Sequence, residues 1–215
     1  YLHSFPTRRS SDLTFPSWDL AQPFRTLAHN GEINTLKGNI NWMKIHEQDM
    51  SSSLFKNVKD LKPVIRSSSD SGALDNVFEL LVHSGKLAPL IKLMMIPDAW
   101  SKRSKTVPKN HQDLFNFLNS TIEPWDGPAA ICATDAKWVL ASSDRNGLRP
   151  LRYTITSDDL LFAGSETGMI KIPEEKIIEK GKLGPGQIIA IDLKKGKLFK
   201  DKALKDLLAK DYKKY

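Results

Sequence analysis

FRTLAHNGEINTLKGNINW, residues 24–42, is the stretch around which the rest of this 215-residue chain is organised. It brings five polar side chains and a glycine into positions 29–35 and then continues into a segment with helical spacing. Asn30-Gly31 is a strong turn signal, because glycine adopts positive φ without steric cost. A glycine N–H beside an asparagine amide is also a pair of neutral donors, which an oxyanion hole requires when a carbonyl becomes tetrahedral. For the dipeptide alone, an ordinary turn followed by a helix cap is the commoner explanation.

The composition indicates a soluble globular protein with one large domain or two small ones, because 40% of the residues are hydrophobic and 27% are charged. We find neither an apolar run as long as a membrane span nor a secretory signal. The single cysteine, Cys132, excludes an internal disulfide and fits a reducing compartment. It lies among apolar residues, which predicts a buried, inert thiol. No Cys/His cluster has zinc or iron–sulfur spacing, so we expect no metal site in this chain.

The net charge of +7 comes mostly from the end of the chain. Lys194 to Tyr215 holds nine lysines and three aspartates, interleaved around leucines in a pattern typical of a solvated helix face. No RNA- or DNA-binding motif accompanies the charge, so we expect no nucleic-acid partner.

Helical spacing dominates the first half of the chain and strand patterns dominate the second. Apolar residues at helical intervals predict helices over 35–48, 87–96 and 113–120, and another that contains Leu74, Val77, Phe78 and Leu81. Asp70 precedes that last helix, where it could serve as an N-terminal cap. Hairpin patterns predict strand pairs at 129–134 with 138–142, 151–155 with 160–163, and 187–192 with 197–200.

Thr14 to Met43 closely resembles the glutaminase domain of the glutamate synthase large subunit, which is a class II, N-terminal-nucleophile glutamine amidotransferase. Five further blocks resemble the same domain in the same order: SSSDSGALDNVFELLV (67–82), LMMIPDAW (93–100), EPWDGPAAI (123–131), DRNGLRPLRY (144–153) and KGKLGPGQIIAID (180–192). An Asn-Gly pair is weak support by itself, whereas six ordered blocks are strong support.

The resemblance implies an α+β fold, the four-layer α-β-β-α sandwich of the N-terminal-nucleophile hydrolases, here incomplete at the N-terminus. We expect residues 1–13, which do not look like the rest of the chain, to be a non-native leader. Residues 14–201 would form a partial type 2 amidotransferase domain, and residues 202–215 a Lys-rich helical tail leading to the next domain. A sheet that lacks strands exposes an unpaired edge, so we expect a marginally stable, aggregation-prone fragment.

The resemblance also implies roles for particular residues. The side-chain amide of Asn30 and the N–H of Gly31 would form the oxyanion hole, and Asp70 would bind the α-ammonium of L-glutamine. Arg149 is expected to be a neighbour of the substrate. Family enzymes attack the glutamine amide with an amino-terminal cysteine, but no cysteine precedes Asn30 here. We therefore expect this chain not to hydrolyse glutamine.

Full-length glutamate synthases pass ammonia to 2-oxoglutarate at a separate site, so the resemblance implies FMN and an iron–sulfur cluster there and no cofactor in this chain. The implied partners are the downstream synthase domains and a reductase small subunit. The implied location is cytoplasmic, or plastid in a photosynthetic eukaryote, with no membrane contact. Two alternatives stay open: a non-catalytic glutamine-binding regulatory domain, and the glutaminase domain of another class II amidotransferase, one acting with phosphoribosylpyrophosphate or glucosamine phosphate.

Overall fold

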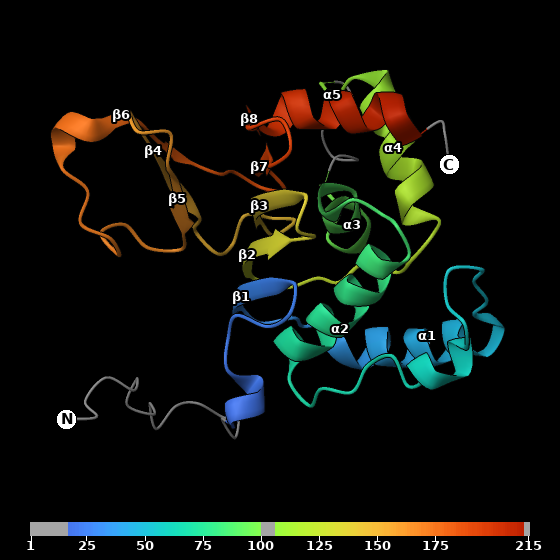
Figure 1. Cartoon of the computed structure of the whole chain (residues 1–215). Helices are drawn as coiled ribbons and strands as arrows, with labels where there is room; N and C mark the ends of the chain where they lie inside the picture. Colours follow the sequence, from blue (N-terminus) through green and yellow to red (C-terminus); the bar gives the residue numbers. More distant parts are fainter. Residues whose placement is uncertain (1–16, 100–105, 213–215) are drawn as a thin grey trace.

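The computed structural model describes residues 17–99 and 106–212, which form two antiparallel sheets and a group of helices (Figure 1). The helices are α1 (Leu36–Asp49), α2 (Asp70–His83), α3 (Ala88–Met95), α4 (Lys109–Asn119) and α5 (Asp201–Asp211), with short 3-10 turns η1 (Trp18–Leu20), η2 (Val58–Leu61) and η4 (Glu174–Lys176). The strands are β1 (Leu27–Gly31), β2 (Ala129–Thr134), β3 (Trp138–Ser143), β4 (Arg152–Thr156), β5 (Leu161–Gly164), β6 (Ile177–Lys182), β7 (Ile188–Asp192) and β8 (Lys197–Phe199). In these described residues, no helix has the length and hydrophobicity of a membrane span.

The larger sheet has the strand order β1-β2-β3-β7-β8 and the smaller one the order β5-β4-β6. The three predicted hairpins are confirmed as β2–β3, β4–β5 and β7–β8. The sequence patterns did not predict β1 or β6. β1 ends in Asn30-Gly31, which suggests a turn, and β6 contains Gly181, which the ring of Tyr153 covers so closely that a Cβ there would lie 2.2 Å from it.

The two faces of the larger sheet have different neighbours. Ile131, Leu140 and Ile188 belong to the main hydrophobic core with the helices, whereas alternate residues, such as Ala130 and Ile189, pack with the smaller sheet. The described residues therefore stack in three layers: the helices, the five-stranded sheet and the three-stranded sheet. The α+β class with two antiparallel sheets is thus confirmed. Among the described helices, none covers the outer face of the smaller sheet, so this part of the chain shows three of the four expected layers (Figure 1).

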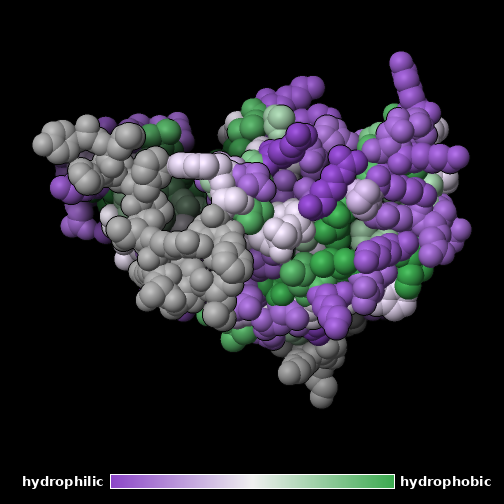
Figure 2. Space-filling view, turned by 90° about the horizontal axis from the view of Figure 1, so that it is seen from below, coloured by the Kyte–Doolittle hydropathy of each residue, from purple (hydrophilic) through white to green (hydrophobic). Residues whose placement is uncertain are grey.

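Helix α1 forms where the sequence predicted a helix but buries less of its surface. Met43 is buried, whereas Trp42 is 48% exposed and Ile45 is 51% exposed. Figure 2 views the molecule from below, and hydrophobic side chains gather among polar ones in the middle of this face. Helix α1 therefore lies at the margin of the domain, and only one stripe of it is buried.

Helix α5, from the Lys-rich end of the chain, packs on the domain. Leu204, Lys205 and Leu208 are buried, and the helix lies against α4 and β7. The solvated face is only the outer side of this helix. The expected leader at 1–13 lies outside the described residues, and the boundary at 201 stays a prediction.

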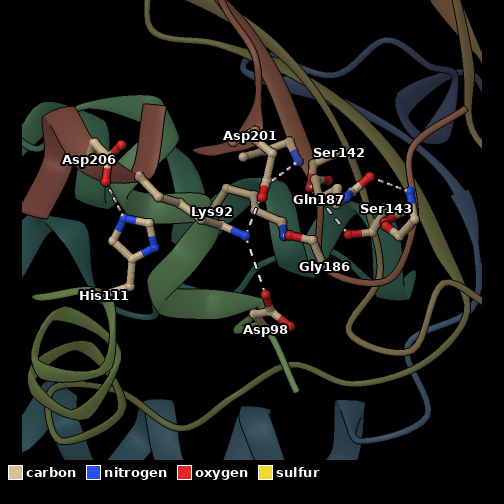
Figure 3. Close-up of polar contacts among 12 residues, drawn as sticks. Lys92, Asp98, His111, Ser142, Ser143, Gly186, Gln187, Asp201 and Asp206 are labelled. Carbon is tan, nitrogen blue, oxygen red and sulfur yellow. Dashed lines mark hydrogen bonds and ion pairs between the residues drawn. The ribbon is translucent and has the colours of Figure 1, made fainter. Parts of the chain in front are cut away.

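A buried cluster of charged groups joins α3 to α5 (Figure 3). The ammonium of Lys205 lies 3.2 Å from Asp98 and 2.8 Å from Asp201. The fully buried Lys92 donates to the carbonyl of Gly186 at 3.3 Å. Burial, aided by the charge of Lys205, lowers the pKa of Lys92 to about 7. Aspartates lie near both lysines, which limits the cost of burying two positive charges.

This pKa predicts a pH-dependent stability. Between about pH 7 and the ordinary lysine pKa, the unfolded chain binds the Lys92 proton and the native chain does not, so Lys92 makes the free energy of unfolding rise with pH. We expect the free energy of unfolding of the wild type minus that of Lys92→Met to increase by up to about 1.4 kcal/mol per pH unit from pH 7 to 9 in urea titrations. Lys109→Met, at an exposed surface pair, is the control. The free energy of unfolding of the wild type minus that of Lys109→Met should not change with pH over this range. Parallel wild-type and Lys92→Met curves would contradict the prediction.

Candidate functional site

The Asn-Gly pair ends β1, the edge strand of the larger sheet. Asn30 lies opposite Ala130, and Gly31 lies opposite Ala129. The next residue, Glu32, donates its N–H to the carbonyl of Pro128 at 2.9 Å. Inward- and outward-facing peptide groups alternate along an antiparallel strand, so the peptide groups of Asn30 face β2. The N–H of Gly31 therefore faces the open edge of the sheet.

Only glycine fits at position 31. A Cβ added there would lie 1.9 Å from the carbonyl oxygen of Pro128, far inside van der Waals contact. The close approach lets the chain leave β1 sharply while keeping the Gly31 N–H at the edge. The predicted turn is thus a strand end, and tertiary contact rather than a hairpin determines the need for glycine.

The side chain of Asn30 is fixed by a residue from the smaller sheet. Its Nδ2 donates to Oγ of Ser165 at 2.7 Å, and Ser165, directly after β5, is 9% exposed. An amide nitrogen carries two hydrogens, so one remains for another acceptor. Asn30 and Gly31 therefore present two neutral donors from adjacent residues at one end of the sheet.

Asp70 lies beside this strand end, at the first residue of α2. Its Oδ2 accepts the N–H of Ile33 at 2.8 Å, and its side chain is 22% exposed, so part of the carboxylate is open to solvent. The helix cap is Ser69, which accepts the N–H of Gly72 at 3.0 Å. The alternative that Asp70 caps the helix does not hold, because Ser69 is the capping residue and the Asp70 carboxylate instead accepts the N–H of Ile33.

Asp75, one turn further along α2, anchors the start of β1. Its buried Oδ1 accepts the N–H groups of Thr26 and Leu27 at 2.9 and 3.1 Å and the hydroxyl of Thr26 at 2.7 Å. These contacts give Asp75 a structural role. Asp75 thus accepts N–H groups at the start of β1 that do not bond to β2.

Arg149 follows a loop held by one buried carboxylate. Asp144 accepts backbone N–H groups from Asn146, Leu148 and Arg149 at 2.9–3.0 Å, and from Ala129 on β2 at 3.0 Å. Among the described residues, Nε of Arg149 is buried without a hydrogen-bond partner. The positive charge of Arg149 also helps to lower the pKa of His29. Arg149 is thus close enough to His29 on β1 to influence its titration, and its expected place beside the substrate stays a prediction.

Four residues in this region were not predicted from the sequence as site residues: His29, Ser71, Asp144 and Ser165. His29, Ser71 and Ser165 act through side-chain contacts with segments distant in sequence, which no local pattern identifies, whereas Asp144 mainly accepts N–H groups of the loop that follows it. The only available signal was the position of His29 next to Asn30, and of Ser71 next to Asp70.

Neither the lone cysteine nor a metal cluster contributes to the site in the described part of the chain. Cys132 lies in β2, and burial raises the pKa of its thiol, which disfavours the reactive thiolate. No group of three or more His, Cys, Asp or Glu side chains in the described ranges could hold a metal ion.

Residues 3–215 match the family model of the class II glutamine amidotransferases, and the chain belongs to this enzyme family. Within it, the chain is 58% identical over 204 residues to the glutamate synthase [NADPH] large chain of Azospirillum brasilense, covering 94% of this chain and 13% of that protein. It is 44% identical over 210 residues to ferredoxin-dependent glutamate synthase 2 of Synechocystis, covering 95% of this chain and 13% of that protein.

A solved glutamine phosphoribosylpyrophosphate amidotransferase from B. subtilis aligns with a TM-score of 0.38 and 21% identity, covering 81% of this chain and 28% of that one. The chain thus spans about an eighth of the length of the two glutamate synthases it resembles.

Removing the Asp75 carboxylate is expected to destabilise the domain. Asp75→Ala leaves two buried N–H groups and a hydroxyl without their acceptor, which costs about 2–4 kcal/mol of unfolding free energy. Denaturant titration measures this change. Glu79→Ala, on the same helix at the surface pair with Arg25, is the control and should change stability by less than about 1 kcal/mol. Equal effects of the two substitutions would show that Asp75 does not anchor β1.

Proposed function

We propose that this chain is the glutamine-binding part of a glutamate synthase, in which glutamine is hydrolysed to glutamate and ammonia for transfer to 2-oxoglutarate. The observation that carries the proposal is the junction of β1 and α2. There, the partly exposed carboxylate of Asp70 accepts the N–H of Ile33, two residues after the Asn30-Gly31 pair that presents the two neutral donors. The extensive identity with two glutamate synthases supports this assignment within the family.

Each residue has a physical role in this proposal. The carboxylate of Asp70 pairs with the α-ammonium of glutamine in a charge-assisted hydrogen bond. The amide of Asn30 and the N–H of Gly31 stabilise the negative charge that develops on the side-chain carbonyl oxygen. Arg149 supplies positive charge beside the same site.

The chain of 215 residues binds glutamine in this proposal without hydrolysing it. Hydrolysis through a thioester requires a cysteine thiolate near the oxyanion donors. The chain has one cysteine, Cys132, which lies in the middle of β2 with its thiol pKa raised by burial. The oxyanion donors alone supply only part of the rate enhancement.

The iron–sulfur cluster of a glutamate synthase does not fit the residues of this chain. An iron–sulfur cluster is held by several cysteine thiolates, whereas this chain has one cysteine. We propose that this cluster, FMN, the synthase domains and any reductase subunit belong to the remainder of the whole protein. The two similar glutamate synthases are named for different electron donors, NADPH and ferredoxin, so we assign no electron donor to this chain.

Glutamine binding tests the proposal directly. Isothermal titration calorimetry with L-glutamine should detect binding to the wild type, and Asp70→Asn should weaken it by about 10- to 100-fold, because a charged hydrogen bond is worth about 1.5–3 kcal/mol. Asn keeps an acceptor for the Ile33 N–H, so the fold should survive. Glu123→Gln, which removes the same charge at the surface beside His46, is the control. Wild-type protein that binds no glutamine would refute the proposal.

A coupled assay of glutamate release tests the predicted lack of hydrolysis. We expect no release above the rate without protein, and Cys132→Ser should leave this result unchanged because the thiol takes no part. Turnover that depends on the protein, and that Asn30→Ala abolishes, would contradict this expectation.

A further inference from the structure

His29 lies in the site region but has no role in the proposed reaction. It precedes Asn30 on β1, and its side chain points to the opposite face of the strand, where it is 0% exposed. A histidine enclosed in this way usually serves as a hydrogen-bonding group that orders its neighbours. Its partners are therefore informative.

The imidazole contacts the first turn of α2. Nδ1 lies 2.7 Å from Oγ of Ser71, and the same nitrogen lies 4.0 Å from Oδ2 of Asp70. Ser71 Oγ in turn donates to the other oxygen of Asp70, Oδ1, at 3.4 Å. One side chain of β1 thus reaches both the hydroxyl and the carboxylate at the start of the helix.

The enclosure of His29 favours the neutral imidazole over the charged form. Burial lowers the pKa of His29 most strongly, the negative charge of Asp70 and the carbonyl of Pro128 oppose this shift, and the positive charge of Arg149 adds to it. With its proton on Nδ1, a neutral imidazole donates to Oγ of Ser71 and leaves the Ser71 hydroxyl hydrogen for Asp70. It leaves the negative charge of Asp70 free, whereas an imidazolium would compete for that carboxylate with an incoming cation.

The Asp70 carboxylate keeps capacity for a ligand. Two carboxylate oxygens provide about four acceptor positions, and the described contacts are the Ile33 N–H on Oδ2 and the Ser71 hydroxyl on Oδ1. The residues before and after Asn30-Gly31 therefore hold Asp70 from two directions and leave part of it exposed.

Resting on the proposed function, we infer that His29 is a positioning residue that holds Asp70, through Ser71, in the orientation that binds the α-ammonium of glutamine. It thereby fixes the distance between the ammonium site on α2 and the oxyanion donors on β1. His29 itself does not touch the substrate, because its side chain is fully buried on the other face of the strand from Asn30.

The test compares L-glutamine with glutaric acid monoamide, which has the same carboxylate and amide but no α-ammonium. The measured quantity is the ratio of the two dissociation constants in calorimetric titrations. Wild type should prefer L-glutamine, and His29→Leu should reduce this preference about tenfold while leaving the affinity for the monoamide within about twofold. His29→Asn, which retains a polar atom near the Nδ1 position, should restore most of the preference.

Ser71→Ala supplies a second route that does not depend on the folding of His29→Leu. It should reduce the preference to a similar extent, and the His29→Leu/Ser71→Ala double variant should show little further loss, because both residues act through one contact. Thermal melting of each variant verifies that the domain is folded.

The outcomes separate the two hypotheses. If wild type fails to bind L-glutamine, the proposed function is wrong. If wild type binds and Asp70→Asn loses the preference, but His29→Leu and Ser71→Ala retain it, the proposed function stands and the role of His29 is wrong. Equal weakening of both ligands in folded His29→Leu and Ser71→Ala would likewise overturn a role specific to Asp70.

Discussion

Polar contacts between β1 and the first two turns of α2 hold the site together. Asp75 binds the strand at its start, Ser71 contacts His29 in its middle, and Asp70 accepts the N–H of Ile33 just beyond its end. The edge of β1 away from β2 has no neighbouring strand in the described part of the chain, so its buried polar groups require side-chain partners. Helix α2 supplies them, and the same contacts set the position of the Asn-Gly pair.

Other parts of the fold support the contacts between β1 and α2. The buried carboxylate of Asp144 binds both Ala129 of β2 and the loop that carries Arg149. Ser165, from the smaller sheet, orients the amide of Asn30. Buried acidic groups with several backbone donors thus act as fixed points for loops, which allows a site to form between elements distant in the sequence. The groups proposed to bind glutamine lie on β1, on α2 and in the loop between β3 and β4.

Secondary structure was predictable where periodicity was strong. The three hairpins and the helices α1 to α3 formed close to the expected residues, because alternation and helical spacing of apolar side chains specify them locally. β1 and β6 were missed because glycine and polar residues interrupt their patterns, and only pairing with β2 and β4 makes them strands. The burial of Leu204 and Leu208 of α5 was likewise missed, since the interleaved lysines around them suggested a solvated helix.

By itself, the sequence determined the family, the α+β class and the candidate residues Asn30, Gly31, Asp70 and Arg149, because ordered motifs and apolar spacing are local properties. Only the tertiary structure decided that Gly31 ends a strand against Pro128, that Ser69 and not Asp70 caps α2, and that His29 contacts Ser71. These features depend on hydrogen bonds and close approaches between segments tens of residues apart. Their partners are selected by how the sheet and helices pack, which no stretch of the chain specifies alone.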